Sequence, residues 1–522
     1  MNRDRVKAVT LAAMCFALFM ANLDDTVMNV ALPQIQISLN SGVSGLQWIL
    51  NAYTLSAASI MLPSGTLGDI YGRKRVFLTG LVIFTIASLI CGLAPSLSIL
   101  IAGRTLQGIG AAALVTGSLS IISDTFPESK EKAKALGIWA AVSGLALVAG
   151  PVIGGLLVDT LGWQSVFFLN LPLGAIAFWV TSHVVKESKD SNKQRLDVTG
   201  LLLSVIFLAS LTYALTQGNA GLWRSPLIVL LLIVAGLSFL AFLFVESRSS
   251  HPMLPLTLFH NSTFAVVNVV EILVFFTVVS LLFIFSLFFQ QVQGYSAGAT
   301  GLRFLPMNGA FVIASIFSGW FAARLGWRFT IATGLIIASI AIFSLIRINA
   351  DTEYGAILWS LILSGFGSGL TLAPLAAVGL SSVPSTKVGI ASAVINTSNR
   401  LGNILGVAIQ GTILTQQLAS DLARSLFAWS LPSNLQDRLI VDVLRGGFQV
   451  PSHLPANIST QAMHQAISNA FMSGLHATVL LASITLLSGA FLILVFVQPT
   501  FNEVTKNAPL SIKQKKRRRM NF

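Results

Sequence analysis

Long apolar runs alternate with short polar segments along almost the whole chain. A helix that crosses a bilayer needs about 20 mostly apolar residues, and roughly fourteen stretches reach that length. The residue-by-residue alternation that is typical of strands in a membrane barrel is absent, so the pattern predicts an all-α membrane protein. The predicted spans are 8–39, 46–66, 76–94, 98–123, 133–157, 163–184, 198–217, 224–246, 262–290, 300–323, 327–348, 354–380, 387–416 and 471–497.

Composition supports this class. Charged residues make up 10% of the chain and hydrophobic residues 54%, which argues against a soluble domain. The net charge is +13, and with an even number of spans and a cytoplasmic N-terminus every basic cluster falls on the cytoplasmic side, as the positive-inside rule requires. A basic run beside anionic lipid explains the tail, so we expect membrane lipids as partners and no nucleic acid. The clusters are Arg3–Lys7, Arg73–Arg75, Lys130–Lys134, Lys186–Arg195 and Lys513–Arg519.

The N-terminus and the cysteines add two expectations. The first apolar run has no convincing cleavage site, so it is interpreted as a retained span and not as a signal peptide. Cys15 and Cys91 lie in apolar spans and imply no disulfide framework.

The chain also repeats itself weakly. GTLGDIYGRKRVFLTGL, at 65–81, resembles GWFAARLGWRFTIATGL, at 319–335. QGIGAAAL and GPVIG, at 107–114 and 150–154, resemble SGFGSGL and GNILG in the second half of the chain. Two related halves around a midplane site are the usual build of a secondary transporter.

The repeat predicts how the chain is divided. Residues 1–184 form one six-helix bundle, 185–261 a linker with two additional spans, and 262–497 a second six-helix bundle. Residues 498–522 form a basic cytoplasmic tail. The single chain contains both halves, so a monomer is expected.

A long extracytoplasmic loop at 417–470 interrupts the second bundle. It contains Pro432, Pro451 and Pro455, and a plausible amphipathic helix runs from about Asn434 to Leu444. The loop is either a solvated connection or a lid over the outer opening.

Two adjacent acids lie inside the first apolar run, in NLDDTVMNVALP at 22–33. A carboxylate at that depth is costly unless it is paired, wet or protonated. Successive helical residues point about 100° apart, so Asp24 and Asp25 face different surroundings. Asp25 belongs to a polar stripe with Asn22, Thr26 and Asn29, which should line a cavity.

Asp24 shares its helical surroundings with Met20, Ala21 and Met28. Apolar surroundings favour a protonated carboxyl group, so we assign Asp24 to the proton. Asp25, on the wetter stripe, is assigned to cationic substrates, although simple structural polarity also explains it. Helical geometry alone leaves open which of the two acids carries the proton.

Further polar residues stand inside other spans. Glu271, with Asn268 one turn before it, is the other clear acid within the membrane and is predicted to bind substrate together with Asp25 and Asn29. Arg104 lies a few residues into the fourth span and must find a partner or a wet cavity. His476 and Arg400 are interpreted as structural.

Glycines mark a turn and a tightly packed helix. Gly68 and Gly72 permit a tight turn after the second span, where Asp69 and Arg73 are able to hold helix ends together as a latch. In the fifth span Pro151 removes a backbone hydrogen bond, and its glycine neighbours allow another helix to approach closely. These neighbours are Gly150, Gly154 and Gly155.

These stretches resemble signatures of the major facilitator superfamily. NLDDTVMNVALP is similar to its first-helix signature, GTLGDIYGRKRV to its loop signature, RTLQGIGAA to its fourth-helix motif and GLALVAGPVIGG to its antiporter motif. WQSVFFLNLPLG, LDVTGLLL and GIASAVINTSNRLGNILGVAI resemble patterns of the fourteen-span drug:proton antiporters.

The resemblance covers nearly the whole chain and implies efflux of amphipathic compounds driven by inward proton flow. It implies proton coupling at Asp24 and Arg104 and a latch at Asp69 and Arg73. In the second copy Ala323 stands opposite Asp69, so the resemblance does not place a latch there.

The expected protein is therefore a multi-pass transporter of the cell membrane, without a cofactor or a metal site. No G-x-x-x-x-G-K-[ST] sequence occurs, which argues against direct use of ATP. The main rival is an exporter of one endogenous molecule, such as a siderophore, a lipid or a peptide. The antiporter motif argues against a nutrient importer. Scattered histidines argue against a membrane enzyme, and the lack of a repeated filter sequence argues against a channel.

Overall fold

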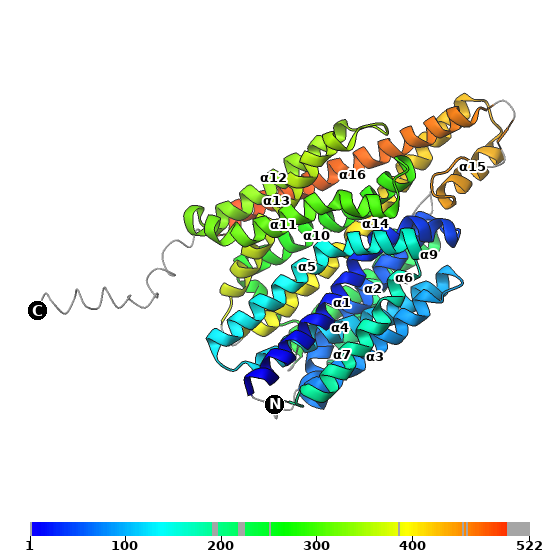
Figure 1. Cartoon of the computed structure of the whole chain (residues 1–522). Coiled ribbons are helices and arrows are strands. Elements are labelled where there is room, and N and C mark those ends of the chain that lie inside the picture. Colours follow the sequence, from blue (N-terminus) through cyan, green and yellow to red (C-terminus); the bar gives the residue numbers. More distant parts are fainter. Residues whose placement is uncertain are drawn as a thin grey trace, which may run out of the picture.

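The chain forms one elongated bundle of long helices (Figure 1). The computed structural model describes residues 3–189, 197–217, 225–249, 252–384, 387–451, 454–455 and 458–497, and within these ranges it contains no β-strand. The helices of the first half are α1 (Arg3–Ser38), α2 (Val43–Tyr71), α3 (Arg73–Gly92), α4 (Leu97–Thr125), α5 (Ser129–Leu161), α6 (Ser165–Phe168) and α7 (Asn170–Val184). They are followed by α8 (Val198–Gln217), α9 (Pro226–Arg248), α10 (Ser262–Leu287), α11 (Ala297–Leu325), α12 (Trp327–Ser344), α13 (Tyr354–Ser381), α14 (Val388–Ala428), α15 (Ser433–Arg445) and α16 (Thr460–Phe496).

The predicted all-α membrane class is confirmed. Among the described residues, twelve helices are long and apolar enough to cross a membrane. The predicted spans 46–66 and 387–416 form the long helices α2 and α14, which are not among the twelve. Both helices carry polar side chains that face the other half of the molecule, such as Asn51 and Asn403, and these lower their mean hydropathy. The number of fourteen spans therefore stays a prediction.

Six long helices in the first half of the chain pack against one another in the same order as six long helices in the second half. In the first half α1 packs on α5, α2 on α4, and α3 on α4 and α7. In the second half α10 packs on α14, α11 on α13, and α12 on α13 and α16. The halves meet where α5 packs on α11 and α2 on α14, while α8 and α9 pack together and α8 contacts both α2 and α14. The basic tail and residues 190–196 of the predicted linker lie outside the described residues.

The glycine motifs of the two halves make equivalent close contacts. A Cβ at Gly110 of α4 would collide with the carbonyl oxygen of Gly80 on α3. The same collision would occur between Gly367 of α13 and Gly334 of α12. These four glycines let the helix backbones touch, so the weak sequence repeat corresponds to repeated geometry.

The turns after α2 and α11 are also equivalent. Gly72 has φ 112° and Gly326 has φ 82°, a region that favours glycine because it has no Cβ. The tight turn predicted at Gly72 is therefore present, and Gly68 accepts the hydrogen bond that ends α2, from the Gly72 amide at 3.0 Å.

The predicted amphipathic helix of the long loop is α15, and it lies at the end of the bundle opposite the N-terminus (Figure 1). Leu439 and Val443 on its apolar face are buried. Gln36 of α1 donates a hydrogen bond to the carbonyl oxygen of Leu444 at 3.0 Å. The loop of the second half thus contacts the first half, and its role as a lid stays a prediction. The predicted loop bounds of 417–470 are too wide, because α14 continues to Ala428 and α16 begins at Thr460.

We expect the α3–α4 contact to tolerate no added side chain. Gly110→Val would force the two backbones apart and lower the free energy of unfolding by about 1–3 kcal/mol, the usual cost of overpacking. Gly236→Val on α9 is the matched control, since a Cβ there meets nothing within 4 Å. Thermal unfolding of the purified variants measures the difference. Equal melting temperatures for both variants would contradict the close packing.

Candidate functional site

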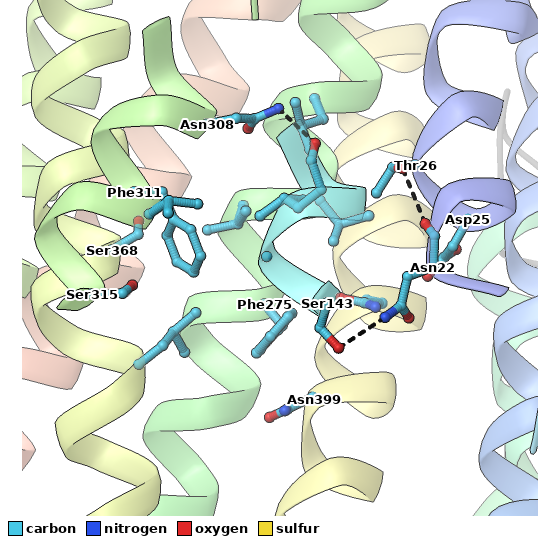
Figure 2. A pocket seen from close by; sticks show the side chains of 18 of the residues that line it. Asn22, Asp25, Thr26, Ser143, Phe275, Asn308, Phe311, Ser315, Ser368 and Asn399 are labelled. Atoms are coloured by element: carbon cyan, nitrogen blue, oxygen red, sulfur yellow. Dashed lines mark hydrogen bonds between the residues drawn. The ribbon is translucent and has the colours of Figure 1, made fainter. Parts of the chain in front are cut away.

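A cavity of about 800 Å³ lies between the two halves. Figure 2 shows Asn22 and Asp25 of α1 on one side, Asn308, Phe311 and Ser315 of α11 on the other, and Asn399 of α14 below them. Most of the lining is apolar, with scattered amide and hydroxyl groups. A large apolar cavity with a few polar groups is the usual form of a small-molecule site.

The polar stripe of α1 lines this cavity, as its helical spacing predicts. Asn22, Asp25, Thr26 and Asn29 all contribute to the wall, whereas Asp24 does not. Asn22 donates a hydrogen bond to the Ser143 hydroxyl at 3.1 Å, which joins α1 to α5 (Figure 2). Asp25 therefore faces the cavity, whereas its neighbour Asp24 faces the interface with other helices of the first half.

Asp24 is only 3% exposed and lies in a polar network inside the first half. Arg104 Nη1 of α4 lies 2.5 Å from Asp24 Oδ2, and the Arg104 guanidinium stacks 4.2 Å from the Tyr53 ring centroid. Gln107 and Asn170 donate to Asp24 Oδ1 at 2.8 and 2.7 Å. Three donors around two carboxylate oxygens suit an ionised aspartate.

The apolar surroundings expected for Asp24 are wrong in one respect. Its neighbours on α1 are indeed apolar and buried, but α4 and α7 supply three polar partners. Asn170 was missed, although an asparagine within the apolar stretch WQSVFFLNLPLG is a signal that could have found it. Helical spacing on one segment does not reveal partners that other segments contribute.

Asp25 forms an ion pair across the cavity. Arg400 Nη1 of α14 donates to Asp25 Oδ2 at 2.9 Å, so α1 and α14 are linked between the halves. Arg400, interpreted from the sequence as structural, lines the cavity. Asp25 is therefore not the unpaired anion that the assignment to cationic substrates assumed.

Glu271 and Asn268 lie behind the cavity wall and not on it. Glu271 is 1% exposed on α10, and Asn399, turned so that its amide nitrogen faces acceptors, donates to Glu271 Oε2 at 2.8 Å. Asn268 Oδ1 accepts a hydrogen bond from Ser398 at 2.9 Å. Neither side chain is among the lining residues, whereas Asn399, the partner of Glu271, is one of them.

The halves are sealed at the end of the bundle that we call the far side, which includes α15. Gln47 of α2 donates to the carbonyl oxygens of Val407 and Ala408 at 2.7 and 3.0 Å. Asp159 of α5 accepts hydrogen bonds at the start of α11, from the amides of Ala297 and Gly298 at 3.0 and 2.8 Å. A negative charge at a helix N-terminus is stabilising.

One glycine of the predicted antiporter motif, Gly155, takes part in the same seal, whereas Gly150 and Gly154 pack within the first half. Gly150 and Gly154 lie against Thr26 and Val27 of α1, and Gly155 lies against the backbone at the start of α11. Pro151 and the carbonyl group that it carries face Gly301 of α11. This motif therefore joins the helices that close the far side.

At the opposite end, which we call the basic side, the described contacts of the predicted latch residues are with their own half and with the start of the linker that follows it. Asp69 Oδ1 accepts from Arg73 Nη2 at 3.0 Å, and Arg73 Nη1 lies 3.5 Å from Asp124 of α4. In the described part of the chain, the hydrogen bonds between the halves lie at the level of Arg400 or toward the far side. These hydrogen bonds close the cavity toward the far side.

No group of three metal-ligating side chains occurs within the described part of the chain. Fold and site together define a multi-pass membrane transporter with one central cavity between two related halves. The Major Facilitator Superfamily model matches residues 14–407, which is most of the chain, so the chain belongs to that family. It is an integral protein of the cell membrane.

Several relatives are similar over most of their length. The multidrug resistance protein Stp of Mycobacterium tuberculosis is 35% identical over 92% of this chain and 90% of its own. The drug efflux pump JefA of the same species is 32% identical over 93% and 97%. The methylenomycin A resistance protein of Bacillus subtilis is 33% identical over 77% and 87%.

Solved structures support the fold alone. A bacterial homologue of the human lysosomal transporter Spinster, in an inward-facing and unoccupied conformation, matches with a TM-score of 0.65 at 16% identity. The match covers 94% of this chain and 98% of that one.

We expect the Asp159 contact to hold the far side closed. Asp159→Ala removes a carboxylate that accepts hydrogen bonds from α11. Loss of such bonds to a charged group should shift the equilibrium between the closed and the open far side about tenfold or more toward the open state. The readout is the rate at which an impermeant maleimide labels Thr300→Cys from the far side, with Cys15 and Cys91 replaced. Asp351→Ala, which removes an exposed acid on the same side, is the control. Similar labelling rates in both variants would contradict the seal.

Proposed function

We propose that this chain is a proton-coupled antiporter that exports amphipathic drugs, including cations, from the cytoplasm by alternating access. The names of its relatives, which are drug efflux and resistance proteins, support export of drugs. The observation on which the proposal mainly depends is that a buried acid, Asp24, directly precedes the cavity residue Asp25 on α1. A proton site and a substrate site are thus consecutive on one helix.

Asp24 and Arg104 are proposed to couple protons. In the present arrangement Asp24 accepts three hydrogen bonds, which suits the ionised form. A proton on Asp24 would remove its charge and release Arg104, leaving a buried cation without its counter-ion. Proton binding would therefore favour a different packing of α1 against α4, and this provides a route from protonation to conformational change.

The sidedness of the cavity agrees with export. With the N-terminus in the cytoplasm, the basic side is cytoplasmic and the described conformation is the one that receives substrate from the cell. In that conformation an antiporter has released its proton, in keeping with the ion pair at Asp24. The substrate residues we propose are Asp25 and Asn29, which line the cavity. Glu271 and Asn268 lie behind the cavity wall, and we propose that they act through it.

An exporter of one endogenous molecule is the second candidate. Its cavity would need polar groups spaced to match one compound, whereas a predominantly apolar cavity accepts many. A transport screen across chemically diverse cations, neutral drugs and lipids separates the two, since a single transported compound would favour the specialist.

We expect Asp24→Asn to stop proton-coupled export of every substrate, because the side chain no longer releases or rebinds a proton. Asp25→Asn should weaken cationic substrates selectively, by about 1 kcal/mol or more, and spare neutral ones. Glu271→Gln should resemble Asp25→Asn. Export of one cation and one neutral compound is measured in vesicles with only an imposed pH gradient. Loss of coupling in Asp25→Asn with intact coupling in Asp24→Asn would reverse the assignment.

The latch residues generate a separate prediction. If Asp69 and Arg73, with the turn at Gly68 and Gly72, stabilise the state closed to the cytoplasm, Asp69→Asn should shift the population toward the cytoplasm-open state. Labelling of a cysteine at Ala140, a cavity residue, should then become faster from the cytoplasmic side.

Asp124→Asn is the control for the latch, since it removes the other carboxylate near Arg73 and is half-exposed on α4. Unchanged accessibility in Asp69→Asn would reduce the motif to a surface turn.

A further inference from the structure

One wall of the cavity, formed by α2 and α14, contains a cation whose pairing is incomplete. Among the described residues that line the cavity, Asp25 and Arg400 are the two charged ones, so their charges cancel. The Arg400 side chain is 16% exposed and that of Asp25 is 29% exposed. A guanidinium carries five N–H donors, and within the described part of the chain Arg400 uses one of them in a hydrogen bond.

The pair is also single and not bidentate. One Arg400 nitrogen contacts one Asp25 oxygen at 2.9 Å, whereas the planar guanidinium fork matches a carboxylate through two parallel bonds. An acid that enters the cavity is therefore able to offer Arg400 a better geometry than Asp25 does. Because the two residues come from different halves, the pair must also separate or shift when the halves move.

Two neighbouring amides are buried without partners. Asn51 of α2 is 1% exposed and Asn403 of α14 is 9% exposed, and both line the cavity. Within the described part of the chain, Asn51 Nδ2 has no hydrogen-bond acceptor and Asn403 Oδ1 has no donor. An orphaned buried amide costs about 1–3 kcal/mol, so a ligand that satisfies it binds more tightly.

The register of α2 against α14 brings these groups together. The two helices run in opposite directions, and Gln47 bonds to the carbonyl oxygens of Val407 and Ala408. One turn further along α2 is Asn51, and one turn back along α14 is Asn403, with Arg400 a turn beyond. The unused donors of Arg400 and Asn51 thus belong to the same strip of the wall.

We propose that this strip is an anion subsite, at which Arg400 exchanges Asp25 for an acidic group of an amphipathic substrate, such as a carboxylate or a sulfonate. The apolar part of the substrate occupies the rest of the cavity, and Asn51 donates a second hydrogen bond to the acid. This extends the substrates of the proposed export function, on which it rests, from cations and neutral compounds to amphipathic acids.

Two dyes that share a scaffold test the subsite. 8-Anilinonaphthalene-1-sulfonate carries a sulfonate, and N-phenyl-1-naphthylamine has the same aromatic scaffold without it. Binding is measured by dye fluorescence with the purified full chain in phosphatidylcholine nanodiscs, after subtraction of empty discs. We expect Arg400→Gln to weaken the anionic dye about tenfold or more, since a hydrogen bond to a charged group is lost, and to change the neutral dye much less.

A substitution of the partner residue, Asp25, should have the opposite effect on binding of the anionic dye. Asp25→Asn removes the carboxylate that competes for Arg400, so it should strengthen binding of the anionic dye. Arg400→Lys retains the charge without the planar fork and should fall between wild type and Arg400→Gln. If Arg400→Gln loses both dyes through misfolding, Asp25→Asn decides. Weaker or unchanged anionic-dye binding in Asp25→Asn overturns the subsite, as does an unchanged ratio of the two dyes in a folded Arg400→Gln.

Export assays separate this proposal from the proposed function. Absence of any export under a pH gradient, with the expected dye-binding pattern, would overturn proton-coupled export and support the subsite. Gradient-driven export of both dyes with no response to Arg400→Gln would support the transporter and overturn the subsite.

Discussion

The cost of placing charge among apolar helices is the constraint on which the central structure depends. Asp24 and Arg104 are buried completely in the first half. Each supplies the opposite charge that offsets the other's desolvation cost, which would be too large for an unpaired charge. The pair requires donors on α4 and α7 to face one point on α1, and this fixes how the three helices pack. A change in the charge of Asp24 would therefore act on the packing of the first half, as the proposed coupling to a proton requires.

Asp25 meets the same constraint in a different way. It lies one residue further along α1 and faces a cavity, so its partner comes from the opposite half. In the proposed alternating access, a pair inside one half would persist while the halves move, whereas a pair between the halves would separate. Of the two adjacent aspartates, Asp24 therefore lies where its charge affects the packing of one half. Asp25 lies where its charge interacts with whatever occupies the cavity.

The fold class was predictable because apolar length and glycine spacing are local properties of the chain. The stripe of Asn22, Asp25, Thr26 and Asn29 was predictable for the same reason, since one helix sets its own faces. Partners from elsewhere were not predictable: Asn170 for Asp24, Arg400 for Asp25 and the start of α11 for Asp159. The predicted spans of α2 and α14 do not pass as apolar spans because their polar residues serve the contact between the halves and the cavity. The polar residues that make these contacts also lower the mean hydropathy of the two helices.

The same reasoning explains why the cavity is neutral although two aspartates begin the sequence signature. Each acid in the membrane region described here has a donor beside it, from Arg104 for Asp24 to Asn399 for Glu271. A substrate charge must therefore compete with a partner already in place, and the cavity selects compounds by how well they replace that partner. Because Arg400 and Asp25 are each only singly bonded, the cavity is able to exchange either one. If the proposed subsite is present, a neutral cavity with an exchangeable ion pair would accept acids, bases and neutral amphiphiles without leaving an unpaired charge in the membrane.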